Sequence, residues 1–429
     1  MRNNKLSQIW KARDIRNDII FVFLMLLIFR LVAHIPVPGI DSSAVKEFLR
    51  GNQFTGLLNI FTGGGLETFS VVMLGVGPYI TSSIIFQLLT MIVPRLEDLS
   101  KEGEYGRQKI NQWTRLLTLP LAALQAYGTL VFLGRNSGGA AGFLSSISLF
   151  QLLTAIISIT AGSLFLMWLG ELISERKVGN GISLLIFAGI ISSIPRSIAQ
   201  ALADYNVDHS VLTSYIIFLV LALIIIAAVI YITEGQRNIP VSYARLTHGS
   251  KTYGGNQTHL PLRINQAGVI PIIFAISLLL FPPLLAQFFS HARTQWIASA
   301  SNFIITTFQN RLIYGILYFV LVFGFTYFYT AIIFHPEQVA ENLQKQGGFI
   351  PGIRPGSETR DYLAKVTNRI VFTGAVFLGV IAVLPLLMQG SSNLNVVIGG
   401  TSLLIVVSVV IETIKQINSQ LIMREYEGF

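Results

Sequence analysis

The feature that most constrains the fold of this chain is a series of long apolar stretches separated by polar segments. A helix needs roughly 20 mainly apolar residues to cross the hydrocarbon core of a bilayer, where it satisfies its own backbone hydrogen bonds. Of the 429 residues, 52% are hydrophobic and only 12% are charged. We therefore predict an all-α polytopic membrane protein with ten transmembrane helices. These lie near residues 18–36, 69–92, 114–134, 149–171, 182–201, 211–233, 267–290, 311–334, 368–388 and 395–414.

The Lys and Arg residues between the apolar stretches predict the orientation of the chain. With the N-terminus in the cytoplasm, 23 of them fall in cytoplasmic segments and five on the other side. Cytoplasmic loops carry such an excess of positive charge, which predicts that both termini lie inside. The same bias accounts for most of the net charge of +9, so the charge does not indicate nucleic-acid binding.

The spacing of the apolar stretches divides the chain into two halves of five helices. We expect a cytoplasmic N-terminal segment at 1–17, a first half at 18–201, a second half at 211–414 and a cytoplasmic tail at 415–429. The first apolar stretch lacks a small-residue cleavage site, so we expect a retained helix. Two cytoplasmic loops, 234–266 and 335–367, are long enough to suggest a function.

A short apolar segment precedes the second predicted helix. Phe54 to Phe61 is too short to span a bilayer, and it leads into Gly63, Gly64 and Gly65. A glycine triplet lets the chain turn sharply. We therefore predict a re-entrant half-helix at about 54–65.

Two motifs recur five helices apart. GVGPYI at 75–80 resembles GVIPII at 268–273, and GISLLI at 181–186 resembles GTSLLI at 400–405. Five is an odd number, so the second half must enter the membrane with opposite polarity. We predict an inverted repeat, whose functional centre lies near the membrane midplane between the halves.

The repeated motifs select a set of aliphatic residues for that centre. Each motif ends in isoleucine, and further isoleucines follow one turn later on two of the helices. A ring of branched aliphatic side chains can close by dewetting without selecting for particular cargo chemistry. The predicted ring consists of Ile80, Ile84, Ile186, Ile190, Ile273 and Ile405.

Several kinds of chemistry lack their usual residues. The chain has no cysteine, no HExxH and no GxSxG motif, so we expect no enzyme activity, metal or other cofactor. The alternative to a passive pore is a secondary transporter of small solutes built on broken-helix inverted repeats. Such a transporter needs ionisable groups near the midplane, whereas Arg30, Glu171 and Arg196 lie towards helix ends, where we expect them to reach the membrane surface.

Six stretches of this chain, in order, resemble the SecY family. They are FRLVAHIPVPGI (29–40), FTGLLNIFTGGGLETFSVVMLGVGPYITSSIIFQLL (54–89), GNGISLLIFAGI (179–190), THLPLRINQAGVIPIIFA (258–275), GGFIPGIRPG (347–356) and GGTSLLIVVSVVIET (399–413). The resemblance extends over nearly the whole chain. It implies the central pore subunit of the bacterial Sec protein translocase, an hourglass-shaped channel in the plasma membrane that opens laterally into lipid between helices 2 and 7.

The resemblance also implies roles for particular residues. The pore ring is the same set of six isoleucines. The half-helix is the plug, formed by Phe54, Leu57, Leu58, Ile60, Phe61, Gly63, Gly64 and Gly65. Loops 234–266 and 335–367 dock a ribosome or the SecA motor ATPase through Arg354, Arg237 and Lys251. Further implied partners are SecE and SecG-like small membrane subunits, secretory and membrane protein precursors with signal sequences, and the lipid bilayer.

Overall fold

Helices account for most of the computed structural model of the chain. It describes residues 12–38, 65, 69–136, 148–207, 209, 211–243, 246–248, 251–253, 257–289, 294–388 and 400–427. Each predicted apolar stretch overlaps one helix. In chain order these are α2 (Arg13–Val32), α5 (Gly77–Ile92), α7 (Glu104–Asn136), α9 (Leu149–Glu175), α10 (Gly181–Val207), α11 (Val211–Glu234), α12 (Ile270–Phe289), α14 (Arg311–Ile333), α16 (Ser357–Met388) and α17 (Gly400–Glu427).

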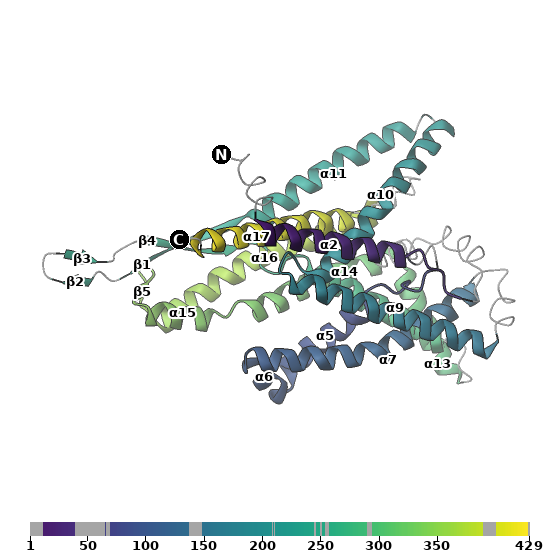
Figure 1. Cartoon of the computed structure of the whole chain (residues 1–429), viewed down its shortest axis with the longest axis horizontal. Helices are drawn as coiled ribbons and strands as arrows, with labels where there is room; N and C mark the ends of the chain where they lie inside the picture. The colour runs from purple at the N-terminus through teal and green to yellow at the C-terminus, as the bar shows by residue number, and fades with distance from the viewer. Residues whose placement is uncertain are drawn as a thin grey trace.

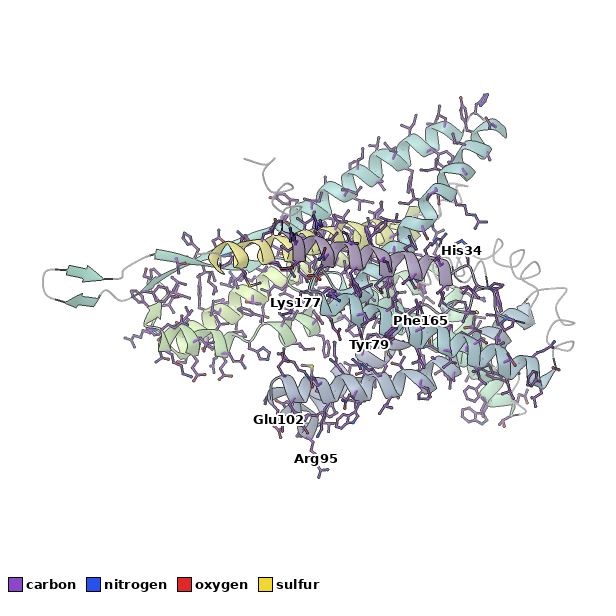
Figure 2. All side chains as sticks on the ribbon, in the orientation of Figure 1. His34, Tyr79, Arg95, Glu102, Phe165 and Lys177 are labelled. Carbon is purple, nitrogen blue, oxygen red and sulfur yellow. The ribbon has the colours of Figure 1, made fainter. Side chains whose placement is uncertain are left out.

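Among the described residues, six helical segments are long and apolar enough to cross a membrane, or seven if the bent pair α5 and α6 (Pro94–Lys101) is one span. The chain is thus a multi-pass membrane protein, and the count of ten spans remains a prediction because α2, α7 and α12 fall outside these criteria. The pair bends by 102° at Val93, since a residue before proline favours extended backbone. Figure 2 shows Arg95 and Glu102 at the outer edge of this corner.

The repeated motifs have matching local structure in the two halves. Gly75 and Gly268 both adopt left-handed backbone, with φ of 58° and 63°. In each case the helix begins two residues later, with proline at its second position, as α5 and α12. Likewise α10 and α17 both begin at the glycine of their shared motif. The sequence repeat is therefore also a repeat of helix starts, which agrees with the predicted two halves.

The main hydrophobic core joins side chains from both halves. Its buried members come from α2, α5, α9, α10, α11, α12, α14, α16 and α17. Close approach between helices depends on small residues, as is common in membrane bundles. A Cβ on Gly162 of α9 would collide with the carbonyl of Val71, and one on Gly181 would collide with the carbonyl of Gly170.

The two long predicted loops fold together at one end of the molecule. Strand β1 (Gln236–Tyr243) pairs with β4 (Gln257–Arg263) and with β5 (Gly348–Phe349), both antiparallel. The short strands β2 (Leu246–His248) and β3 (Lys251–Tyr253) pair beyond them. Figure 1 shows these strands projecting from the end that also carries α15 (Pro336–Lys345). A separate core beneath them includes Ile239, Leu262, Ile350, Leu363 and Val366. We call the unit formed by β1–β5 and α15 the cytoplasmic module, after the predicted orientation.

The C-terminal segment differs from the predicted tail. Helix α17 continues to Glu427 rather than ending near 414. Contacts with neighbouring elements stabilise the extension: Lys415 Nζ lies 2.8 Å from Glu234 Oε1, and Gln420 Nε2 donates to the Lys177 carbonyl at 2.9 Å. These contacts join residues far apart in sequence, so sequence patterning gave no sign of them.

Candidate functional site

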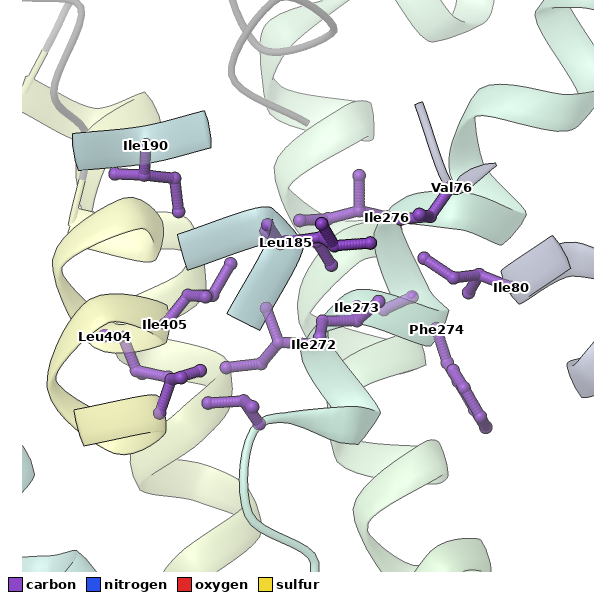
Figure 3. Packing of buried hydrophobic residues seen from close by; sticks show 14 of the residues in the cluster. Val76, Ile80, Leu185, Ile190, Ile272, Ile273, Phe274, Ile276, Leu404 and Ile405 are labelled. Atoms are coloured by element: carbon purple, nitrogen blue, oxygen red, sulfur yellow. The ribbon is translucent and has the colours of Figure 1, made fainter. Parts of the chain in front are cut away.

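The six predicted isoleucines lie together in the main core. Each is at most 4% exposed, and all six belong to one hydrophobic cluster. Ile80 and Ile84 come from α5, Ile186 and Ile190 from α10, Ile273 from α12 and Ile405 from α17. Figure 3 shows side chains from these four helices meeting, with Ile80 and Ile273 on facing elements. The structure thus brings the set together, and its gating role remains a prediction.

Sequence reasoning missed several aliphatic neighbours of these isoleucines. Buried side chains from the same four helices, and from Val76 directly before α5, lie around them (Figure 3). The helical ones include Leu185, Ile272, Ile276 and Leu404. Most of these residues lie within or next to the repeated motifs, so the motifs could have identified them from the sequence. The six isoleucines are therefore part of a larger packed aliphatic layer.

A polar cavity of about 480 Å³ adjoins this layer. The cavity is lined by residues of α5, α7, α9, α12, α14 and the start of α10. Its apolar lining residues are Ile80, Ile182, Ile270, Ile273 and Phe274. The polar and charged lining residues are Tyr79, Ser83, Gln87, Asn111, Arg115, Glu171, Ser174, Glu175, Asn180, Ser183 and Tyr329. In the predicted orientation most of these residues lie towards the cytoplasmic ends of their helices, whereas Tyr79 lies near the outer start of α5. We call this cavity the vestibule; it adjoins the aliphatic layer that contains the predicted ring.

An ion pair in the vestibule corrects one expectation from the sequence. Arg115 Nε of α7 donates to Glu171 Oε1 of α9 at 2.6 Å. Glu171 was expected to reach the membrane surface, but it lines the cavity and has a cation as its partner. Its side chain is 18% exposed and that of Arg115 is 48% exposed, so water screens the pair and its net contribution to stability is small.

Hydroxyl groups fix α5 beside α7 near the constriction. Ser82 Oγ, fully buried, donates to the Thr114 carbonyl at 2.7 Å. Thr81 Oγ1 instead donates back to the Gly77 carbonyl of its own helix at 3.1 Å. The first bond crosses between helices, and the second satisfies a hydroxyl without a partner helix. α5 is therefore held on its α7 side.

Two of the predicted docking residues lie on adjacent parts of the cytoplasmic module. Arg237 is exposed on β1, opposite Leu262 of β4. Arg354 is exposed in the turn after β5, between Gly352 and Gly356, whose φ angles are 83° and 106°. Left-handed backbone favours glycine, which explains the glycines of this motif. Lys251 belongs to β3, and its backbone pairs with that of His248.

The predicted plug lies almost wholly outside the described residues. Only Gly65 is described; it is buried, and its carbonyl accepts a hydrogen bond from the Ser70 amide at 2.9 Å. Phe54, Leu57, Leu58, Ile60, Phe61, Gly63 and Gly64 fall in the undescribed stretch. The plug therefore stays a prediction. Within the described part of the chain, no cluster of three or more His, Asp or Glu residues could hold a metal ion.

Comparison with known proteins decides the family. The SecY family model matches residues 70–414, a range that includes the constriction, the vestibule and the cytoplasmic module. This chain belongs to the SecY family. All six isoleucines of the ring predicted for this SecY-family chain fall within the matched range, whereas the predicted plug lies before it.

Bacterial relatives of this SecY-family chain align along almost their entire length. Proteins named Protein translocase subunit SecY from Bacillus licheniformis and Streptomyces galbus are 44% and 43% identical over 433 and 438 residues. In both comparisons 99% of this chain and 98% of the relative are covered. The relative of that name from Thermotoga maritima is 43% identical over 428 residues, covering 98% and 96%.

Solved structures share the SecY-family fold at much lower identity. One described as "The structure of a protein conducting channel" has a TM-score of 0.62 and 18% identity, covering 93% of this chain and 91% of that one. Another, described as Sec61 in the canine ribosome-channel complex from the endoplasmic reticulum, has a TM-score of 0.59 and 19% identity, with the same coverage. At such identities the likeness establishes the fold alone.

Proposed function

We propose that this chain is the central pore subunit of the Sec protein translocase in the bacterial plasma membrane, conducting unfolded polypeptides. The observation that carries the proposal is the vestibule, whose lining includes Ile80 and Ile273 of the predicted ring. A polar cavity can hold a hydrated chain, while an aliphatic constriction closes by dewetting and offers no fixed charge or hydrogen bond to select among side chains. The relatives at 43–44% identity are named as translocase subunits.

The constriction is proposed to act as a compliant seal. Its six isoleucines come from four helices rather than from one rigid element. When those helices separate slightly, the ring widens around the passing chain. After passage, the aliphatic side chains repack and exclude water. Such a seal has no chemistry of its own, so the energy for movement comes from a partner.

The proposed lateral exit lies between α5 and α12, which correspond to predicted helices 2 and 7. These helices contact each other directly, and the surfaces near their starts are apolar, with Ile80 on one and Ile273 and Ile276 on the other. No described hydrogen bond or ion pair joins the two helices. Their separation therefore breaks only apolar contacts and would give a transmembrane segment a route into lipid.

The cytoplasmic module is the proposed docking site for a ribosome or the SecA motor. Arg237 and Arg354 project from one unit with its own hydrophobic core. The short segment 264–269 connects β4 to α12, and within it Ile264 N donates to the Gly235 carbonyl at 2.9 Å. A partner that moves the module would thus act on α12. SecE and SecG-like subunits, and a plug formed by 54–65, complete the proposed translocase.

A reconstituted system can separate this proposal from solute transport. The chain would be purified with its small subunits, placed in proteoliposomes and supplied with SecA, ATP and a secretory precursor. We expect the precursor to become protected from added protease only when both ATP and the chain are present. Uptake of a small solute driven by an ion gradient, without any precursor protection, would instead favour the transporter alternative.

A further inference from the structure

Helix α13 (Gln295–Gln309) carries more uncharged polar residues than α12 before it or α14 after it. None of its 15 residues is charged, and it connects α12 to α14. Figure 1 shows it at the end of the molecule opposite the strands of the cytoplasmic module. In the predicted orientation that end faces the outside of the cell.

One face of α13 packs on the protein. Ser301 is 5% exposed, and Phe308 packs against the main core. Ile297, Ile304 and Ile305 are half-buried on the same side. Contacts with both α12 and α14 hold the helix in place. α13 is therefore a fixed part of the fold.

The remaining surface of α13 divides into two stripes of different chemistry. The polar stripe is formed by Gln295, Asn302 and Gln309, all exposed and seven residues apart. The aromatic stripe is formed by Trp296 and Phe303, which are 72% and 71% exposed. At 3.6 residues per turn the two stripes lie about 110° apart around the helix. Around the helix axis, the polar stripe and the aromatic stripe are separated from the protein-facing side by similar angles.

Two threonine hydroxyl groups next to the aromatic stripe are already satisfied. Thr306 Oγ1 donates to the Asn302 carbonyl at 2.9 Å, and Thr307 Oγ1 donates to the Phe303 carbonyl at 2.7 Å. Hydroxyls bonded to their own helix need no water or partner protein. This removes much of the cost of placing the aromatic stripe in an apolar medium.

We infer that α13 is an interfacial helix whose aromatic stripe enters the boundary between headgroups and acyl chains of the outer leaflet. Its polar stripe faces water and its third face packs on the protein. Tryptophan is enriched at this depth of a bilayer, and amphipathic helices lie there in the membrane plane. Only Asn310 separates α13 from α14, a candidate membrane span, and its side chain accepts from the Leu312 amide at 3.0 Å. The helix is thus attached at the level of the membrane surface.

The absence of charge predicts which lipids the helix accepts. An interfacial helix that depends on Lys and Arg prefers anionic headgroups, and salt weakens its attachment. Here the burial of Trp296 and Phe303 provides the attraction. The depth of Trp296 and Phe303 in the bilayer should therefore be the same in zwitterionic and anionic vesicles.

Fluorescence quenching in proteoliposomes can test the inference on the full chain. Trp10, Trp113 and Trp168 would be replaced by Phe, leaving Trp296 as the single fluorophore. Vesicles of phosphatidylcholine would carry bromine either near the headgroup or near the acyl-chain end. Three further variants would carry Trp296→Phe as well, together with one new tryptophan each. Phe303→Trp reports on the aromatic stripe and Asn302→Trp on the polar stripe. Leu223→Trp, on an exposed position of α11, is the control for deep burial.

We expect Trp296 and the Phe303→Trp indole to be quenched more by shallow than by deep bromine. Adding phosphatidylglycerol to the vesicles should not change this quenching. The Asn302→Trp indole should be quenched least by either lipid, and the Leu223→Trp indole most by deep bromine. Equal quenching of the three α13 indoles would overturn the inference. So would emission of Trp296 that bromolipids leave unchanged, since this would mean that water, a subunit or a second copy covers the stripe.

Discussion

At the residue scale, the fold depends on places where two backbones meet without room for a side chain. Gly162 of α9 is one of these, because an added Cβ would collide with the carbonyl of Val71. Backbone cannot move aside as a side chain can, so a larger residue must separate α9 from the segment that leads into α5. Not every glycine has this function: Gly324 of α14 has no atom within 4 Å of an added Cβ.

This contrast gives a matched pair of substitutions. Gly162→Ala should destabilise the chain by about 1–3 kcal/mol, the usual cost of overpacking, and should lower the midpoint of thermal unfolding in detergent. Gly324→Ala should leave the midpoint unchanged or raise it, since alanine favours helix by about 1 kcal/mol over glycine. Equal midpoints for the two variants would contradict the packing described at Gly162.

A second residue-scale prediction concerns the seal. Replacing Ile80 and Ile273 together by Ser should wet the constriction and raise ion conductance of reconstituted channels on the order of tenfold, because a polar lining removes the dewetting barrier. The lipid-exposed pair Ile217 and Ile224 on α11, changed in the same way, provides the control. If ion conductance rose only in the variant with the α11 pair changed, conductance would not report on the isoleucine ring.

The convergence of the six isoleucines in one cluster could be predicted from sequence, because helical spacing and the internal repeat both mark them. Ile80 and Ile273 occupy the same place in two copies of one motif, and Ile84 follows Ile80 by one turn. The ion pair between Arg115 and Glu171 could not be predicted in this way. Its partners lie 56 residues apart, and nothing in either helix specifies the rotation that makes them face each other.

At the element scale, α5 and α12 are proposed to separate when a signal sequence or transmembrane segment enters. Ser83 of α5 and Ile270 of α12 both line the vestibule, which makes them suitable sites for a bridge. Cysteines at these positions, joined by a short bifunctional maleimide with a cleavable spacer, should reduce precursor translocation about tenfold or more, because a fixed pair of helices cannot open. Cleaving the spacer should restore the activity.

A bridge within one half provides the control for this lock. A Cβ on Gly315 of α14 would lie 3.5 Å from Val383 Cγ1 of α16, so the same maleimide cross-linker can join cysteines at these two positions. That link should leave translocation nearly unchanged. Full activity with α5 and α12 bridged would argue against an opening between them.

The cytoplasmic module leads to a prediction about docking. Arg354→Glu should weaken binding of SecA or ribosomes to proteoliposomes by roughly tenfold, since it reverses an exposed charge held in a rigid turn. The measurement is a co-sedimentation titration at two salt concentrations. Arg95→Glu on α6, also exposed, should have a smaller effect. Equal losses for both variants would indicate general electrostatic attraction rather than a docking residue.

The strands of this module carried a signal that the long-loop interpretation overlooked. Ile239 and Val241 are buried in β1 while Asn238 and Pro240 are exposed, the alternation expected of a strand with one covered face. The pairing of β1 with β5 was beyond sequence reasoning, because it joins two loops separated by α12 and α14. Such non-local pairs depend on where the helices place the loop ends.

At the scale of the whole molecule, the sequence predicted a helical membrane protein with two related halves, and the matching helix starts at Gly75 and Gly268 agree with that prediction. What composition could not provide is the layering along the membrane normal. The structure contains a vestibule with polar lining residues, an aliphatic layer beside it and an uncharged helix at the end opposite the cytoplasmic module. That layering is the physical basis for proposing a pore.

The most direct test of the pore is the path of a polypeptide held within it. Because the chain has no cysteine, single cysteines can be placed at Ile84, at Ile273 and, facing lipid, at Leu223 of α11. A secretory precursor with one cysteine, stalled during translocation, should form disulfides with the cysteines at Ile84 and Ile273 and not with the one at Leu223. Disulfides with Leu223→Cys alone would contradict the account, because the precursor would then pass outside the isoleucine constriction.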